Sequence, residues 1–140
     1  MRVFVGIVVG IMVALAVQAG VDLITNQLYP AAISDIWDRR QISEAFAARP
    51  TGALLLSVLG FFLGGFTGAL AAKRVSRAGW TVWVPSGVLA LMALVITFNF
   101  PLPAWTWFAA LAAPLIGGLL ARHVGGEVDA AEEAGGDAAV

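Results

Sequence analysis

Apolar residues in this chain are gathered into four long runs separated by short polar segments. These runs cover about residues 3–23, 51–72, 80–98 and 104–121. Each run is close to the ~20 residues that a helix needs to cross the apolar core of a bilayer. Because that core offers the backbone no water, an isolated spanning segment is expected to be helical. We therefore predict an all-α integral membrane protein, a four-transmembrane-helix bundle in which residues 1–124 form a single domain.

The segment between the first two runs carries a short amphipathic pattern. Asp38 precedes Gln41 by three positions, which is typical of a capping box at the start of a helix. Apolar residues as far as Phe46 then fall on one face, and Pro50 ends the pattern. We expect a short interfacial amphipathic helix between the first two transmembrane helices, with Trp37 as its anchor at the membrane surface.

Small residues recur every four positions in three of the four runs. The glycines of this zipper are Gly6, Gly10, Gly60, Gly64, Gly68 and Gly117. A four-residue spacing places them on one face of each helix, where they let two backbones approach closely. The third run has only traces of the pattern. We therefore expect the first, second and fourth helices to make the closest backbone contacts and the third to be more exposed to lipid or to face a partner.

Composition supports a membrane protein and sets the last residues apart. Hydrophobic residues make up 60% of the chain and charged residues 12%, with a mean hydropathy of +0.89. Soluble domains contain about 45–50% apolar and about 25% charged residues. Residues 125–140 differ from the rest because they are mainly glycine, alanine and acidic residues. We predict that they form an acidic disordered tail.

Basic residues are unevenly divided between the two ends of the predicted bundle. One end carries Arg2, Lys73, Arg74, Arg77 and Arg122, and the other carries Arg39, Arg40 and Arg49. Since cytoplasmic loops are enriched in Lys and Arg, this division favours a multi-pass protein of the bacterial inner membrane with both termini cytoplasmic. Lys73, Arg74 and Arg77 are expected to set the topology and to contact lipid headgroups. A dimer with dual topology is the alternative.

Asp22 is the one acidic residue within or beside a predicted span. It lies ~30 Å along the first helix, near the outer headgroups, where a carboxylate is an ordinary interfacial group bonded to Asn26 or to another helix. Asp22 is also a candidate site for a solute or a proton, because carboxylates within membranes mark such sites. Gln18 lies one turn away on the same face, and we expect its amide to bond across to another helix. A polar path from Asp22 through Gln18 is the alternative.

Further polar and aromatic residues are predicted to lie at the same membrane face as Asp22. The candidate polar pocket consists of Asp22, Gln18, Asn26, Tyr29, Asn99 and Trp105. Such a set can line a shallow pocket that has a few polar groups and aromatic walls. Tyr and Trp at this depth are equally typical of the aromatic belt of membrane proteins, so both interpretations stay open.

Residue types that carry common catalytic and metal chemistry are scarce. The chain has no cysteine and a single histidine, His123, with no further ligand at metal-binding spacing. No nucleophilic triad, paired intramembrane carboxylates or phosphate-binding loop is present in the sequence. We expect no metal, no cofactor and no nucleic-acid partner, and an enzyme is the least favoured class.

Several short motifs occur in the order found in one group of proteins. They are Asp22 followed by Tyr29-Pro30, then Pro50-Thr51-Gly52-Ala53, a glycine-rich second span, and Asn99 with Pro101, Pro103 and Trp105. Over nearly its whole length the chain resembles a family of small bacterial four-span proteins of uncharacterised function. Members often carry histidines before Tyr-Pro and within the Pro-x-Pro turn, where this chain has Gln27 and Leu102. The resemblance implies a four-span fold and no activity.

Two kinds of function follow from these features. The first is a small structural or accessory module whose glycine faces pack against a second copy or a larger membrane protein. The alternative is a transporter or channel for a small solute, with an outward-facing polar mouth at Asp22, Asn26 and Asn99. A polar cavity that reaches from Asp22 towards the middle of the bilayer would favour transport. An apolar interior and a bare glycine face would favour the accessory module.

Overall fold

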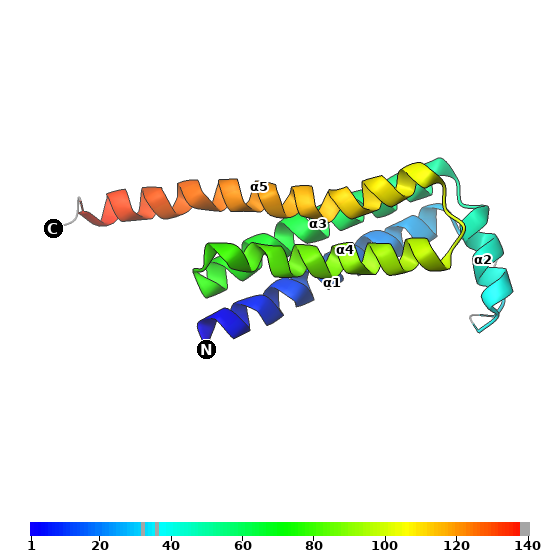
Figure 1. Ribbon diagram of the computed structural model, residues 1–140, viewed down its shortest axis with the longest axis horizontal. Coiled ribbons are helices and arrows are strands. Elements are labelled where there is room, and N and C mark those ends of the chain that lie inside the picture. The colour runs from blue at the N-terminus through cyan, green and yellow to red at the C-terminus, as the bar shows by residue number, and fades with distance from the viewer. Residues whose placement is uncertain (32, 36, 138–140) are drawn as a thin grey trace.

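A computed structural model of the chain describes residues 1–31, 33–35 and 37–137, with side chains described as far as residue 124. The helices are α1 (Arg2–Leu28), α2 (Arg39–Ala47), α3 (Thr51–Ser76), the 3₁₀ turn η1 (Gly79–Val82), α4 (Trp83–Asn99) and α5 (Ala104–Asp137). No strand occurs in this part of the chain. Four segments are long and apolar enough to cross a membrane, namely α1, α3, η1 with α4, and Ala104–Val124 of α5. The predicted all-α architecture with four apolar helices is confirmed (Figure 1).

Three helices are longer than the apolar runs that predicted them. α1 continues to Leu28 and α3 continues to Ser76, because polar residues such as Asn26 and Arg74 extend a helix beyond its apolar stretch as readily as they end it. α5 runs as one helix to Asp137 and projects past the other helices (Figure 1). Its last turns contain alanine and glutamate, which have high helix propensity. Disorder of residues 125–140 stays a prediction, although the described backbone there is helical.

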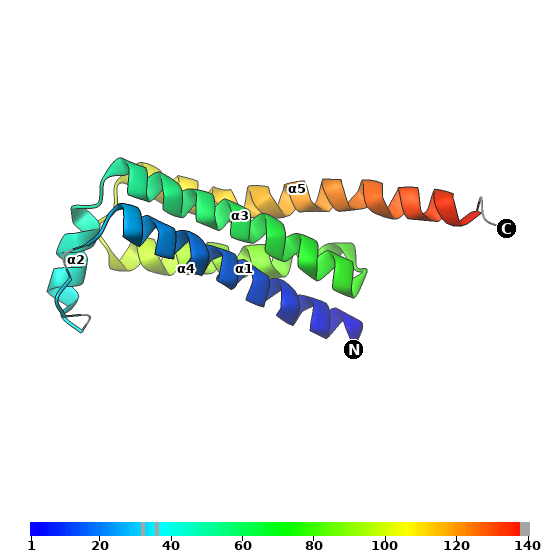
Figure 2. The same cartoon turned by 180° about the vertical axis from the view of Figure 1, so that it is seen from behind.

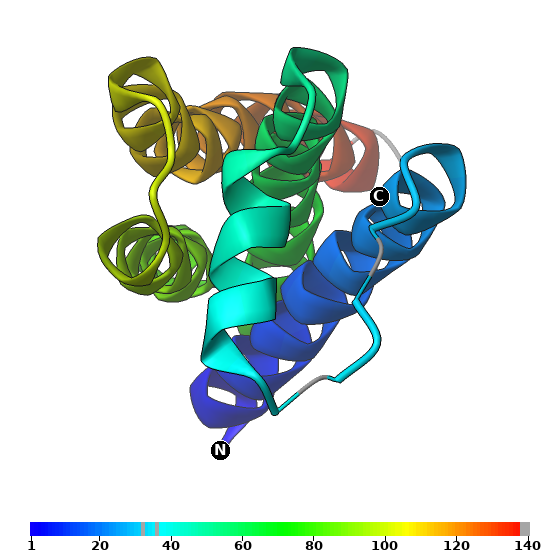
Figure 3. The ribbon, with the colours of Figure 1, turned by 90° about the vertical axis from the view of Figure 1, so that its right-hand side faces the viewer.

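α3 is the central helix of the bundle. α1 packs along one side of α3 and α5 along another, while α4 fills the angle between α5 and α3 (Figures 1 and 2). α2 lies across one end of the bundle (Figure 3). The N-terminus and the projecting end of α5 lie at the opposite end (Figure 1). We call the end covered by α2 the outer end and the other the inner end.

Glycines bring α3 into backbone contact with both α1 and α5. A β-carbon added to Gly68 would lie 2.6 Å from the carbonyl oxygen of Gly10 on α1. A β-carbon added to Gly117 of α5 would lie 2.5 Å from the carbonyl oxygen of Phe62 on α3. Such distances do not occur between real atoms, so only glycine fits at these positions. The predicted close contacts of the second span with the first and with the fourth are confirmed, whereas the first and fourth spans do not contact each other.

The prediction that the third span is the most exposed is wrong. In the most apolar 18-residue stretch of the η1–α4 span, 44% of the residues are buried. The corresponding stretch of α1 has 22% of its residues buried. The reason is the position of α1 at the edge of the bundle, where its small residues bury one narrow strip against α3. The larger side chains of α1, such as Phe4, Met12 and Leu23, face outwards.

α2 begins as its sequence pattern predicts. The Asp38 carboxylate accepts hydrogen bonds from the backbone N–H groups of Arg40 at 2.9 Å and Gln41 at 3.5 Å. The other half of the predicted capping box is missing, because the side-chain oxygen of Gln41 accepts from the Ser34 hydroxyl at 3.0 Å instead. Trp37 is 86% exposed, and its role as a membrane anchor stays a prediction.

Arg77 directly follows the last residue of α3 and caps the helix in a left-handed backbone conformation with φ 56°. Glycine is the usual residue at such a helix end because a β-carbon costs energy there. Lys73, one turn earlier, donates from Nζ to the carbonyl oxygen of Arg122 at 3.4 Å and so links the inner ends of α3 and α5. Contact of Lys73, Arg74 and Arg77 with lipid headgroups stays a prediction.

Candidate functional site

Gln18 of α1 bonds to Asp22 on its own helix rather than to a neighbouring helix. Gln18 is 2% exposed, and its Nε2 donates to both carboxylate oxygens of Asp22 at 3.3 Å. The expected bond from Gln18 across to another helix is therefore wrong. The neighbour that faces Gln18 Oε1 on α3 is Gly60, which has no side chain to offer. As a result Gln18 Oε1 is buried without a hydrogen-bond partner.

Arg49 is held over the outer end of the bundle by two neutral groups. Its Nη2 donates to the side-chain oxygen of Asn26 at 3.3 Å. Its guanidinium carbon lies 4.6 Å from the centre of the Phe46 ring, a cation–π contact. Phe46 in turn stacks on Phe100, with ring centres 4.2 Å apart. The end of α2 is thereby fixed to the loop that joins α4 to α5.

Beneath Arg49 and Phe46 the outer half of the bundle contains a cavity of about 180 Å³. Its lining comes from α1, α3, α4 and α5, with Phe46 and Arg49 above. The lining residues are Asp22, Asn26, Phe46, Arg49, Leu54, Ser57, Val58, Phe61, Ala93, Ile96, Thr97, Leu102, Thr106 and Ala110. The cavity therefore combines apolar walls with a carboxylate, a guanidinium and three hydroxyl groups. We refer to it as the inner cavity because it lies between the helices, although it belongs to the outer half of the bundle.

Two hydroxyl groups of the inner cavity have no protein partner. Ser57 Oγ on α3 and Thr106 Oγ1 on α5 are both buried and make no hydrogen bond. Thr97 on α4 differs, because its hydroxyl lies 2.9 Å from the carbonyl oxygens of Ala93 and Leu94. A buried polar group without a partner costs about 1–3 kcal/mol. Ser57 and Thr106 thus add two buried hydroxyl groups without protein partners to the charged and polar residues that line the cavity.

The opposite charges of Asp22 and Arg49 both line the inner cavity but do not form an ion pair. Within the described residues, the ion pair that does form joins Arg40 to Glu44 on the surface of α2, at 3.0 Å. Asp22 is instead bonded to Gln18, and Arg49 is bonded to Asn26. The inner cavity therefore presents a negative group and a positive group that are available to a third molecule.

The inner cavity ends about halfway across the bundle. Phe61 lies ten residues into α3, which corresponds to ~15 Å of helix. Below this level an apolar cluster that includes Ala14, Leu89 and Ala113 closes the interior. The backbone contacts at Gly64, Gly65 and Gly68 follow directly. The cavity is consequently closed on its inner side.

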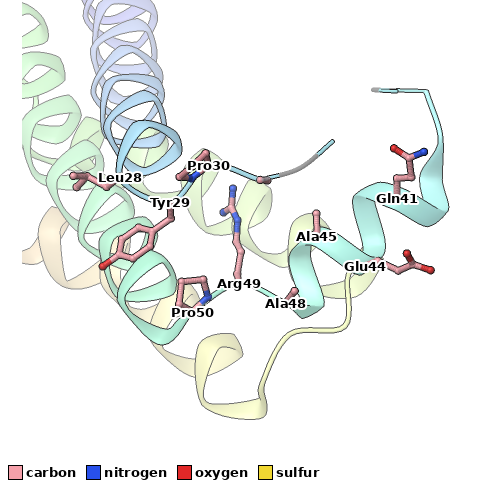
Figure 4. Close-up of a pocket in the computed structure, with 10 residues that line it drawn as sticks. Leu28, Tyr29, Pro30, Gln41, Glu44, Ala45, Ala48, Arg49 and Pro50 are labelled. Carbon is pink, nitrogen blue, oxygen red and sulfur yellow. The ribbon is translucent and has the colours of Figure 1, made fainter. Parts of the chain in front are cut away.

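A second, open cleft of about 510 Å³ lies outside the bundle, between the end of α1, α2 and the start of α3 (Figure 4). Tyr29, Pro30, Glu44 and Arg49 are among its lining residues. The Tyr29 hydroxyl packs so closely on Gly52 that a β-carbon there would lie 2.5 Å away. Arg49 lines both this cleft and the inner cavity, so it lies at the boundary between them.

The predicted polar pocket is divided by the structure. Asp22 and Asn26 line the inner cavity, and Gln18 reaches it through its bond to Asp22. Tyr29 lines the outer cleft. Asn99 donates to the carbonyl oxygen of its own helix at Val95 and accepts from Arg39. Neither Asn99 nor Trp105 lines the cleft or the inner cavity.

Sequence reasoning missed the residues that complete the inner cavity. Ser57 and Thr106 are single hydroxyl residues in apolar runs, and no periodic signal set them apart. The charge pattern assigns Arg49 only to the basic residues of the outer end. Its position directly before Pro50 and one turn after Phe46 places it where α2 turns back into the bundle, which is the signal that could have identified it.

The zipper glycines are all engaged within the chain. A β-carbon on any of them would lie within 3 Å of another helix of the same molecule, as at Gly6 against Ser76 and at Gly64 against Ala14. The zipper therefore leaves no bare glycine face among the residues that predicted it. Across the described residues, no group of three His, Cys, Asp or Glu side chains is placed to hold a metal ion.

No protein-family model matches the chain, and neither do curated proteins or solved structures. The similarity to uncharacterised four-span proteins accordingly stays a prediction.

Proposed function

We propose that this chain is a multi-pass membrane protein that binds a small solute in the outer half of its helix bundle, as a transporter or channel. The observation that carries the proposal is the pair of unpartnered buried hydroxyls, Ser57 and Thr106, in a cavity that also contains Asp22. Empty cavities in proteins are apolar, whereas polar cavities of this size hold water or a ligand. Polar groups that face the interior of a membrane bundle characteristically mark a solute path.

A bacterial inner membrane with both termini in the cytoplasm is the orientation that we propose. The inner end carries Arg2, Lys73, Arg74, Arg77 and Arg122, while each of the four acidic residues before residue 125 belongs to the outer half. The positive-inside rule places the inner end in the cytoplasm, where anionic headgroups would contact these side chains. The inner cavity would then open away from the cytoplasm.

An accessory module is the second candidate. Its expected binding surface, the glycine zipper, is already occupied by contacts within the chain. A second copy or a larger membrane protein would therefore have to bind elsewhere, and the outward face of α1 offers the least buried surface among the four spans. Large apolar residues on that face serve equally well as contacts with lipid.

Cysteine labelling tests whether the inner cavity is reached by water from outside. The chain has no native cysteine, so Ser57→Cys introduces a single thiol. In right-side-out vesicles, a small membrane-impermeant methanethiosulfonate is expected to label it. The matched control is Ser86→Cys on α4, because Ser86 is 0% exposed, bonds to the carbonyl oxygen of Val82 and lies in the closed inner half.

Labelling of Ser57→Cys that is no faster than labelling of Ser86→Cys would remove the basis for solute binding. The accessory module would then be the better account. Labelling only in inside-out vesicles would reverse the proposed orientation while retaining the solute-binding site.

A further inference from the structure

We propose that the solute of the inner cavity is a small zwitterion whose ammonium group binds Asp22 and whose carboxylate binds Arg49. This inference rests on the proposed function, because it names the class of solute that the same cavity accepts. It draws on the charges of the inner cavity, on their unused hydrogen-bonding groups, and on the size and walls of the cavity.

Each charge is positioned by neutral neighbours rather than by the other charge. Gln18 Nε2 holds the Asp22 carboxylate at 3.3 Å, while Asn26 and the Phe46 ring hold the Arg49 guanidinium. Asp22 and Arg49 are both partly buried, and neither forms an ion pair within the described residues. Opposite charges attract more strongly in such surroundings than in bulk water. A molecule with one positive and one negative group would satisfy both charges at once.

Unused hydrogen-bonding groups around the inner cavity fit the same molecule. An ionised carboxylate has room for more acceptor bonds than Gln18 supplies, and an ammonium group carries three donors. The described side-chain hydrogen bond of Arg49 uses one of the N–H groups of its guanidinium, which pairs with carboxylates in a two-point geometry. Thr106 and Ser57 add hydroxyl donors without partners of their own.

Size and lining limit the solute to a small compound with an aliphatic part. The cavity of about 180 Å³ corresponds to the volume of about six water molecules. Sites for drug-sized ligands enclose ~300–1,000 Å³, so a larger molecule or a lipid would not fit. Leu54, Val58 and Ile96 form apolar walls against which a short branched chain can pack. A compound of the size of valine meets these requirements.

Isothermal titration of the purified full chain in detergent tests this inference with three matched probes. Valine carries both charges, isobutylamine lacks the carboxylate, and 3-methylbutanoate lacks the ammonium group. Valine is expected to bind at least about tenfold more tightly than either single-charge compound, which corresponds to ~1.4 kcal/mol. Equal binding of valine and one single-charge compound would overturn the zwitterion, since the second charge would then contribute nothing.

Two substitutions separate the contributions of the charged groups. Asp22→Asn is expected to weaken valine binding at least about tenfold and to leave the affinity for 3-methylbutanoate unchanged. Arg49→Gln is expected to weaken valine equally and to leave isobutylamine unchanged. Asp38→Asn and Arg40→Gln are matched controls at the same end of the bundle, because neither residue lines the inner cavity. Loss of valine binding in both controls as well would contradict the assignment.

A labelling experiment avoids substitutions of the charged residues, which matters if a charge variant fails to fold. Valine is expected to slow the labelling of Ser57→Cys, while isobutylamine and 3-methylbutanoate at the same concentration are expected to have little effect. If Ser57→Cys is labelled rapidly and valine gives no protection, the zwitterion inference is wrong and the water-filled cavity stands. If Ser57→Cys is never labelled, the proposed function and this inference fail together.

Discussion

The inner and outer halves of this bundle are built from the same four apolar helices but are packed in different ways. In the inner half, α3 touches α1 and α5 backbone to backbone, through Gly68 and Gly65. In the outer half, α3 presents Leu54, Ser57 and Phe61 to its neighbours, and a cavity of about 180 Å³ remains between the helices. Side-chain size along α3 therefore determines where the bundle is closed and where it has space.

This contrast has a physical basis in membrane proteins. Lipid gives apolar helices no hydrophobic reason to associate, so close packing has to come from small residues. Gly64, Gly65 and Gly68 supply that packing in the inner half, and the outer half contains the cavity with its polar groups. At the outer end, where α2 crosses the bundle (Figure 3), the cavity is lined by Phe46 of α2 and by Arg49 just after it, and Phe100 stacks on the Phe46 ring.

Adding a methyl group to the zipper is expected to have the largest effect on stability. Gly68→Ala would drive a β-carbon against the Gly10 carbonyl oxygen, and we expect a loss of about 3 kcal/mol in the free energy of unfolding. Gly87→Ala is the matched control, because nothing lies within 4 Å of a β-carbon at Gly87 on α4. That control is expected to gain about 0.5–1 kcal/mol. Unfolding in mixed detergent micelles measures both, and equal effects would contradict the tight inner half.

Enlarging alanine on α5 compares the two halves within one helix. Ala121→Leu in the inner half, where the residue is 0% exposed, is expected to cost about 2 kcal/mol through overpacking. Ala110 lines the inner cavity, which has room for the added atoms. Ala110→Leu is therefore expected to lower the free energy of unfolding by less than about 1 kcal/mol. The same unfolding measurement applies. A larger loss for Ala110→Leu than for Ala121→Leu would show that the outer half is not the looser one.

Removing the unpartnered hydroxyl of Thr106 from the inner cavity should stabilise the protein. Thr106→Val keeps the shape of the side chain and eliminates an unpartnered buried oxygen, so we expect a gain of about 1 kcal/mol without solute. Thr97→Val loses a hydroxyl that bonds to the Ala93 carbonyl and is expected to cost about 1 kcal/mol. Thermal unfolding of both variants gives the signs. A gain from Thr97→Val together with a loss from Thr106→Val would reverse the assignment of the free hydroxyl.

The smallest expected effect concerns α2, which covers the outer half. Asp38→Ala removes the side chain that caps the start of α2 and is expected to weaken that helix by about 1 kcal/mol. Hydrogen exchange in residues 39–47 should accelerate by about fivefold, with no change in the unfolding of the four spans. Slower exchange, or a fall in bundle stability of similar size, would mean that α2 is part of the bundle core.

Sequence reasoning located the spans and the tight helix contacts because both leave periodic signals. Long apolar runs gave the helices, and the four-residue spacing of Gly6 to Ala14 and of Gly60 to Ala72 gave the faces that meet. α1 was expected to be better buried than the third span, and that order is reversed, because spacing does not reveal whether a helix lies at the edge of the bundle.

The inner cavity was harder to predict because its residues are distant in the sequence and carry no repeat. Ser57 and Thr106 line the same cavity only once α3 and α5 have packed together. Asp22 is a candidate because it is the one carboxylate in a predicted span, and it lines the inner cavity, while its role in binding a solute stays a prediction. Asn99 failed to join it because its side chain bonds to its own helix and to Arg39.

Hydrogen exchange along α3 tests the difference between the two halves most directly. Full-length protein in lipid nanodiscs would be exchanged into deuterium oxide, and peptides that cover residues 53–61 and 64–72 would be compared by mass spectrometry. The outer segment borders the inner cavity and is expected to exchange at least about tenfold faster than the inner segment, which the zipper holds between α1 and α5. Equal exchange of the two segments, or faster exchange of residues 64–72, would contradict a closed inner half and an open outer half.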